Sequence, residues 1–168
     1  MPDLDGARCF SVLDAKSGYW HVELDEPSSL ATTFGTPWGR YRWLRMPFGL
    51  SPAPEEFQRR MNSVLQDLPG VKVIADNILI FGKGATDAEA FADNDRNLTL
   101  LMDRCQNKGL KLISKKLQLR LSEVTYMGHR ITADGLKVDP EKTKAIREMP
   151  VKYLGGQWTI CMLDQPQI

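Results

Sequence analysis

The first half of the chain alternates short apolar runs with polar or glycine-containing breaks. Residues 10–13 form an apolar run that ends at Asp14, and residues 19–24 form a second run. Residues 31–34 and 40–44 flank a turn that contains proline and glycine, which predicts a β-hairpin. The runs are too short for ordinary helices, so we expect strands in this part of the chain.

Residues 71–81 are the most informative stretch of the sequence. Two β-prone runs flank Asp76 and Asn77, which predicts a tight hairpin with a carboxylate at its tip. Asp14 ends an earlier strand, so two acidic strand ends meet if these strands are neighbours. Such a pair of oxygen ligands suits a divalent metal ion. Each motif alone is more often a turn or a helix cap.

Two segments have apolar residues at helical spacing. Residues 52–68 form the first helix, which a Pro-Gly pair ends. The second begins at Thr86, where the sequence has the pattern of a capping box, and Gly109 is its predicted C-terminal stop. A third helix is predicted to open at Asp139, with Pro140 in its first turn. The predicted apolar stripe of the second helix comprises Phe91, Leu98, Leu101, Met102 and Cys105.

The mixture of strands and helices predicts one domain of the α/β class, with α+β organisation. Four more short strands are predicted at residues 116–121, 124–127, 129–131 and 136–138. We assign the domain to residues 1–150. Residues 151–168 have no clear hydrophobic period, and we interpret them as a divergent C-terminal tail.

Composition sets wide limits on function. The 168 residues carry a formal net charge of +1, which neither requires nor excludes a nucleic-acid partner. Residues 40–45 interleave arginines with aromatic side chains, as nucleic-acid surfaces and amphipathic edge strands both do. His21 and His129 are too isolated to indicate a metal site. The start of the chain does not resemble a signal peptide, and no apolar run of about 18 residues predicts a membrane span.

The three cysteines are far apart in the sequence and have no zinc-type spacing. An odd number of separated cysteines argues against a disulfide framework. We therefore expect a reducing compartment, which is the cytoplasm or the nucleus.

Several motifs, taken together and in order, resemble the reverse transcriptase of gypsy-type long-terminal-repeat retrotransposons. The resemblance covers residues 8 to about 150. The matching segments are residues 10–20, 32–34, 41–50, 53–58, 74–79, 109–112 and 126–129.

This resemblance implies a reverse-transcriptase palm, built on a ferredoxin-like antiparallel sheet with packed helices. The implied activity is that of an RNA-directed DNA polymerase, which joins a primer hydroxyl to a deoxynucleotide by two-metal phosphoryl transfer. By resemblance, Asp14, Asp76 and Asn77 occupy the catalytic positions. Asp14, Asp76 and the carbonyl of Ala15 are the implied ligands of two Mg²⁺ or Mn²⁺ ions.

The resemblance also implies how substrates bind. Tyr19 looks like the side chain that excludes a 2′-hydroxyl, and Lys116 like the lysine that protonates the leaving pyrophosphate. Phe48 and Gly49 complete the implied nucleotide site. The implied partners are an RNA or DNA template-primer and deoxynucleoside triphosphates, with no membrane partner. The segment that resembles the primer grip comprises Tyr126, Met127, Gly128 and His129.

Three departures from the family pattern predict impaired activity. The family hairpin carries two aspartates, whereas this chain has Asn77 after Asp76, and a neutral amide holds a cation less well. The fingers region expected before Phe10 and the thumb, connection and RNase H regions expected after Pro150 have no counterpart in this sequence. We therefore expect a truncated copy, with a partner chain as one source of the missing regions. The alternative is an inactive remnant that binds nucleic acid or another protein.

Overall fold

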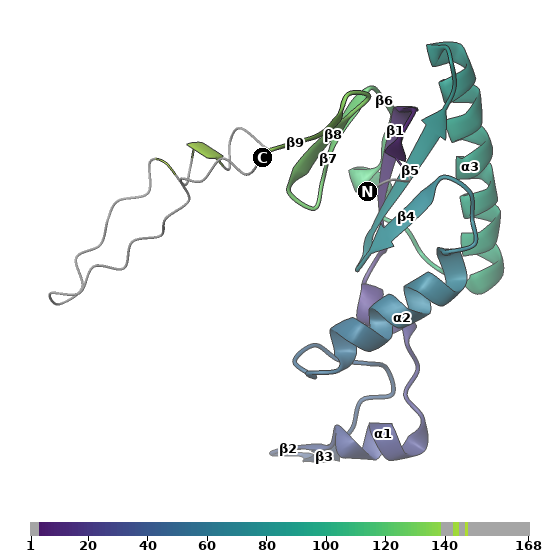
Figure 1. The fold of residues 1–168 in the computed structure, drawn as a ribbon. Coiled ribbons are helices and arrows are strands. Elements are labelled where there is room, and N and C mark those ends of the chain that lie inside the picture. Colours follow the sequence, from purple (N-terminus) through teal and green to yellow (C-terminus); the bar gives the residue numbers. More distant parts are fainter. Residues whose placement is uncertain (1–3, 139–142, 145–146, 148–168) are drawn as a thin grey trace, which may run out of the picture.

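The computed structural model of the chain describes residues 4–138, 143–144 and 147. Figure 1 shows a central sheet with long helices along one side, a small second sheet on the other side, and a separate lobe of short elements. The predicted helix at Asp139 and Pro140, and the predicted tail at residues 151–168, lie outside the described residues.

The central sheet has four strands in the order β4-β5-β1-β6, and all neighbours are antiparallel. Together with helices α2 and α3, these strands follow each other along the chain as β1-α2-β4-β5-α3-β6. This is the βαββαβ arrangement of the ferredoxin-like fold, as expected from the sequence. The strands are β1 (Ala7–Asp14), β4 (Val71–Ile74), β5 (Asn77–Lys83) and β6 (Gln118–Leu121).

Helices α2 (Ala53–Leu65) and α3 (Asp87–Lys108) cover one face of this sheet. Thr86 and Glu89 form the predicted capping box of α3, and Gly109 ends the helix in the left-handed conformation at φ 67°. Both helices were predicted from apolar spacing. Side chains from both helices pack against the strand residues Leu13, Ile78 and Ile80. The helix residues in this core are Phe57, Met61, Leu65, Leu101 and Cys105.

The buried stripe of α3 differs from the predicted one. Phe91 and Met102 are exposed, whereas Asn94 and Asn97 are buried. The reason is a close approach between helix and sheet, because a Cβ atom on Gly82 of β5 would lie 2.0 Å from the carbonyl oxygen of Ala90. Large apolar side chains do not fit there. The two asparagines instead hydrogen-bond to the side chain of one strand residue and to strand carbonyl groups.

The second sheet covers the other face of the central sheet (Figure 1). It contains the antiparallel strands β7 (Glu123–Tyr126), β8 (His129–Thr132) and β9 (Gly135–Val138), close to their predicted positions. The contact is apolar and joins Val124, Tyr126 and Ile131 to Phe10, Leu79 and Phe81.

In residues 16–50 the observed secondary structure differs from two predictions. Residues 19–24 were expected as a strand, but Gly18–His21 form a 3₁₀ helix, and only Glu23 makes a β-bridge. The predicted hairpin exists but is shorter, with β2 (Phe34–Thr36) and β3 (Gly39–Tyr41). Residues 26–31 instead form helix α1 (Glu26–Ala31), whose N-cap Asp25 accepts a hydrogen bond from the backbone of Ser28.

Smaller corrections apply elsewhere. Lys116 was placed in a strand, but it ends a 3₁₀ turn, Ser114–Lys116, before β6 begins. Cys9 and Cys105 are free and buried, and burial raises the pKa of each thiol to about 11. None of the helices in the described part of the chain combines the length and the apolarity that crossing a bilayer requires.

Candidate active site

Asp14 lies at the end of β1 and is almost completely buried. Its carbonyl accepts a hydrogen bond from the backbone N–H of Ile113 at 2.9 Å. Its carboxylate accepts a hydrogen bond from the ammonium group of Lys116, with Nζ 2.7 Å from Oδ2. A buried carboxylate with a cationic partner is thus fixed at the end of a central strand.

Asp76 lies in the turn between β4 and β5. The turn residues are Ala75 and Asp76, while Asn77 begins β5 and pairs with Ile74 on one side and Asp14 on the other. The expected tip, Asp76 followed by Asn77, is therefore shifted by one residue. The carbonyl of Asp76 accepts a hydrogen bond from the backbone N–H of the residue after Asp14 at 2.7 Å, so the two aspartates lie side by side as expected.

Asn77 contacts Asp76 through its amide nitrogen. Nδ2 lies 3.2 Å from Oδ1 of Asp76 and donates to it. The side chain at this position therefore stabilises the neighbouring carboxylate without adding a negative charge of its own.

A cavity of about 330 Å³ opens at this point, and we call it the Asp14–Asp76 cavity. Six of the predicted site residues line this cavity. Gly49 follows the lining residue Phe48 in the sequence but does not itself line the cavity. The lining comprises Asp14, Ala15, Ser17, Gly18, Tyr19, Phe48, Phe57, Ala75, Asp76, Ile113 and Lys116.

Aromatic rings form one wall of the Asp14–Asp76 cavity. The Tyr19 ring packs against Phe48, with centroids 5.2 Å apart, and edge-on against Phe57 at 5.4 Å. A Cβ atom on Gly18 would lie 2.8 Å from the Phe57 ring, so only glycine lets the chain pass this closely. The sequence did not indicate Phe57 as a lining residue, because its helical spacing assigned it to the side of α2 that faces the hydrophobic core.

Lys116 is the cation of this cavity. Its hydrogen bond to Asp14 and the negative charges of Asp14 and Asp76 raise the pKa of the ammonium group. Asp76 therefore lies near enough to the lysine that binds Asp14 to add to this shift.

The segment expected as a primer grip lies apart from the cavity lining. Tyr126 is buried under the central sheet, its hydroxyl donates to the carbonyl of Asn77 at 3.1 Å, and burial raises the pKa of that hydroxyl to about 12. Met127 and Gly128 form the turn between β7 and β8 with φ 50° and 79°, and His129 is exposed next to them. The structure thus separates a buried tyrosine from an exposed turn.

The donor set fits magnesium or manganese in its chemistry. Two carboxylates and a backbone carbonyl offer hard oxygen ligands, and Mg²⁺ is commonly held by one or two carboxylates together with substrate phosphates. Across residues 4–138, 143–144 and 147, no group of three acidic, histidine or cysteine side chains could hold a metal ion. Asn77, which was expected at a catalytic position, is not among the residues that line the Asp14–Asp76 cavity.

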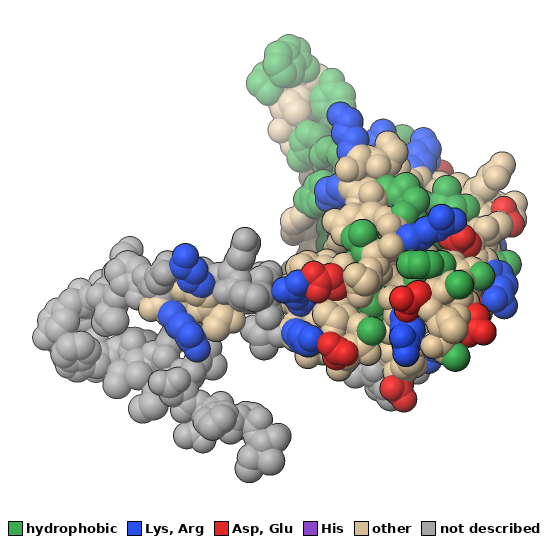
Figure 2. All heavy atoms as spheres, turned by 90° about the horizontal axis from the view of Figure 1, so that it is seen from above, with side chains coloured by type: hydrophobic (Ala, Val, Ile, Leu, Met, Phe, Trp, Pro, Cys, Tyr) green, Lys and Arg blue, Asp and Glu red, His purple; other side chains and the backbone are tan. Residues whose placement is uncertain are grey.

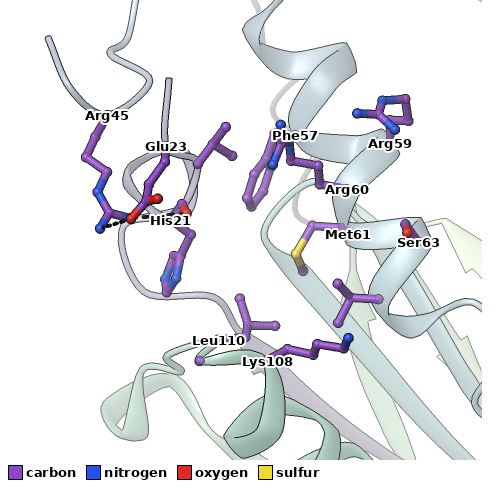
Figure 3. Close-up of a pocket in the computed structure, with 13 residues that line it drawn as sticks. His21, Glu23, Arg45, Phe57, Arg59, Arg60, Met61, Ser63, Lys108 and Leu110 are labelled. Carbon is purple, nitrogen blue, oxygen red and sulfur yellow. Dashed lines mark hydrogen bonds and ion pairs between the residues drawn. The ribbon is translucent and has the colours of Figure 1, made fainter. Parts of the chain in front are cut away.

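A larger cavity of about 590 Å³ lies at α2 and the end of α3 (Figure 3). Arg59 and Arg60 extend from α2, Lys108 lies at the end of α3, and Arg45 forms an ion pair with Glu23 at 2.7 Å. None of the predicted site residues lines this larger cavity, whose lining includes several charged side chains. Figure 2 shows Lys and Arg interspersed with Asp and Glu on the face drawn there, rather than gathered in one basic field.

Comparisons with known proteins identify the relatives of this chain. Residues 1–131 match the family described as Reverse transcriptase (RNA-dependent DNA polymerase). The chain is 36% identical over 150 residues to the Retrovirus-related Pol polyprotein from transposon 297 of Drosophila melanogaster, which covers 88% of this chain and 14% of that protein. It is 33% identical over 152 residues to the corresponding polyprotein from transposon gypsy of the same organism, covering 89% of this chain and 14% of that protein.

The fold also matches a solved structure, described as that of the foamy viral protease-reverse transcriptase dRH in complex with ds DNA. The TM-score is 0.72 at 23% sequence identity, over 85% of this chain and 24% of that one. This chain therefore spans only a small part of the length of the relatives that it matches. With two aspartates from distant segments in one cavity of a palm fold, the chain belongs to the reverse transcriptase family and is related to the Pol polyproteins of retrotransposons such as gypsy.

Proposed function

We propose that this chain forms the catalytic palm of a retroelement polymerase that synthesises DNA on an RNA or DNA template. The observation that carries the proposal is the Asp14–Asp76 cavity, where two carboxylates from distant strands meet an aromatic wall and a lysine. Template-primer and deoxynucleoside triphosphates are the proposed substrates.

Asp14, Asp76 and the carbonyl of Ala15 would hold two Mg²⁺ or Mn²⁺ ions. Such ions would activate the primer hydroxyl and neutralise charge on the reacting phosphates. The buried position of Asp14 supports this role, because a carboxylate with little access to water interacts more strongly with a cation.

The other residues of the cavity would bind and orient the nucleotide. Tyr19 is held between Phe48 and Phe57, so its ring has little freedom and would exclude a 2′-hydroxyl. Phe48 and Gly49 would contact the nucleotide or the template from the open side. The hydrogen bond to Asp14 raises the pKa of the Lys116 ammonium group, which is protonated at neutral pH with or without this contact. Lys116 would donate a proton to the leaving pyrophosphate.

The exposed turn between β7 and β8 is the part of the predicted primer grip that remains able to touch a primer. Tyr126 would act indirectly, because its hydroxyl is buried against the backbone of Asn77. Buried free thiols at Cys9 and Cys105 fit a reducing compartment, the cytoplasm or the nucleus.

We also propose that activity needs protein regions outside this sequence. The support is an exposed apolar surface on the lobe around α1, β2 and β3, where Trp38 is 85% exposed and Tyr41 51%. Phe34 and Trp43 extend this surface, with ring centroids 5.9 Å apart. A contiguous apolar surface of this kind indicates a partner segment, from the same polyprotein or from another chain.

A second candidate function is that of a non-catalytic nucleic-acid-binding or interaction module. Asn77 favours it, because the site lacks the charge of a third carboxylate. The same exposed aromatic surface would serve such a module as its contact with a base or a protein.

Primer extension separates the two candidates. The assay compares the 168-residue chain with a fusion in which the preceding and following segments of the transposon 297 polyprotein flank residues 8–150. We expect the chain alone to be nearly inactive and the fusion to extend the primer. Asp14→Asn should abolish extension by the fusion, whereas Asp103→Asn on the exposed side of α3 should not.

A fusion that binds the template-primer and Mn²⁺ but never extends the primer would refute the catalytic proposal and support the second candidate. Adding Asn77→Asp to the 168-residue chain should not restore robust extension, because the substrate contacts that the flanking polyprotein segments would supply are worth at least as much as one charged ligand.

A further inference from the structure

The turn that carries Asp76 contains a backbone conformation that alanine seldom adopts. Ala75 has φ 53°, in the left-handed region where the Cβ atom crowds a carbonyl oxygen. A residue other than glycine keeps this conformation only where surrounding contacts enforce it. The contacts around Ala75 therefore show what holds the turn in place.

One side chain of α2 reaches both sides of this turn. Gln58 accepts a hydrogen bond from the backbone N–H of Ala75 at 2.6 Å, and its Nε2 donates to the carbonyl of Val73 at 3.2 Å. Nε2 also donates to Oδ1 of Asn62, one helical turn further along α2, at 2.8 Å. Both acceptors need the amide nitrogen, so the amide oxygen of Gln58 faces Ala75.

The backbone at Asp76 and Asn77 is held at two more points. The N–H of Ala15 donates to the carbonyl of Asp76 at 2.7 Å, and the hydroxyl of Tyr126 donates to the carbonyl of Asn77 at 3.1 Å. These groups come from the end of β1 and from β7, whereas Gln58 comes from α2. Three successive residues are thus held from three different elements.

We propose that Gln58 is a positioning residue, which fixes the Asp76 carboxylate beside Asp14 for binding a divalent cation. The inference rests on the proposed polymerase function. Phe57 and Met61 already anchor α2 in the core, so the Gln58 amide is not required for packing the helix. Its hydrogen bonds to the sheet reach only Val73, near the end of β4, and Ala75, in the turn next to the Asp76 carboxylate.

Gln58→Met tests this role, because methionine keeps the length of the side chain and removes the amide. Gln66→Met, at the exposed end of the same helix, is the matched control. Both are made in the full chain. Amide hydrogen exchange at Ala75, followed by NMR, reports on the turn, and electron paramagnetic resonance measures Mn²⁺ affinity.

We expect Gln58→Met to lose exchange protection at Ala75 and to bind Mn²⁺ about ten- to hundredfold more weakly, the usual effect of losing a group that orients a ligand. Gln66→Met should match the wild type in both measurements. Glycine adopts a positive φ without strain. Adding Ala75→Gly to Gln58→Met should therefore recover part of the Mn²⁺ affinity, which general loss of folding would not allow.

Unchanged protection of Ala75 in Gln58→Met overturns the inference. The inference is also overturned if Gln58→Met loses the protection of Ala75 but binds Mn²⁺ as tightly as the wild type. If the wild-type chain itself binds no Mn²⁺, the proposed metal site fails instead, and exchange at Ala75 alone decides whether Gln58 holds the turn.

Discussion

Asn77→Asp is the substitution that most directly probes the candidate site. Asn77 begins β5, lies opposite Asp14 in the β1–β5 pairing, and donates from Nδ2 to Oδ1 of Asp76 at 3.2 Å. An aspartate there loses the donor and places a third carboxylate beside two others. We expect opposite effects with and without a divalent cation.

Without metal, Asn77→Asp should destabilise the fold. A hydrogen bond to a charged acceptor contributes about 1.5–3 kcal/mol when buried, and less in this half-buried turn. Repulsion between neighbouring carboxylates adds to the loss. A total of about 1–2 kcal/mol corresponds to a fall in Tm of roughly 2–8 °C for a chain of this size.

With metal, the sign should reverse. One well-placed charged contact is worth about 3–4 kcal/mol in enzyme sites, on the order of a few hundredfold in rate. Affinity for Mg²⁺ or Mn²⁺ should therefore rise at least about tenfold. Since a ligand at about 100 times its dissociation constant stabilises the folded state by about 2.7 kcal/mol, Asn77→Asp should gain more from added magnesium than the wild type.

Calorimetric melting in EDTA and in magnesium, together with isothermal titration of Mn²⁺, measures both effects. Asn107→Asp, at an exposed position in the last turn of α3, is the control for a new negative charge. It should leave Mn²⁺ affinity unchanged and, because it opposes the helix dipole, lower stability by about 0.3–1 kcal/mol equally with and without magnesium. If Asn77→Asp leaves metal-free stability and Mn²⁺ affinity unchanged, the side chain at 77 does not belong to the Asp14–Asp76 site and the reasoning is wrong.

Three further outcomes follow from other contacts. Gly82→Ala should cost about 2–3 kcal/mol in urea unfolding, because its Cβ atom would overlap a carbonyl of α3, whereas Gly35→Ala, which has open space around it, should cost far less. Lys116→Met should raise Mn²⁺ affinity by no more than about tenfold in a titration, because an exposed lysine competes only weakly for its carboxylate partner. Cys9 and Cys105 should resist thiol reagents at pH 8 and react as the pH approaches their raised pKa of about 11, or once the protein unfolds, which peptide mapping after labelling would show.

The fold was predictable where local signals and hydrophobic period agree. The capping box at Thr86, the stop at Gly109 and the hairpin around Asp76 depend on neighbouring residues only, and each lies within a residue or two of its predicted place. The short helix at residues 26–31 was missed although Asp25 and Pro27 are good starting signals, because its few residues show no apolar period.

The polar face of α3 could not be read from the sequence. Burial of Asn94 and Asn97 follows from the close approach that Gly82 permits, and this approach is a tertiary contact between residues far apart in the chain. The same holds for Gln58, whose partners lie 15 and 17 residues away. Side chains that act by hydrogen-bonding distant backbone groups leave no periodic signal.

The geometry of the site depends mainly on backbone atoms. Ala75 is held through its N–H, and Asp76 and Asn77 are held through their carbonyl groups. None of these contacts uses the side chain of residue 77, so replacing a carboxylate by an amide there changes the charge of the site and leaves the turn in place. A catalytic palm and a non-catalytic remnant would consequently share this fold and differ in their affinity for divalent cations. Mn²⁺ affinity therefore reports on the charge of the site better than thermal stability does, and primer extension then decides between the two proposed functions.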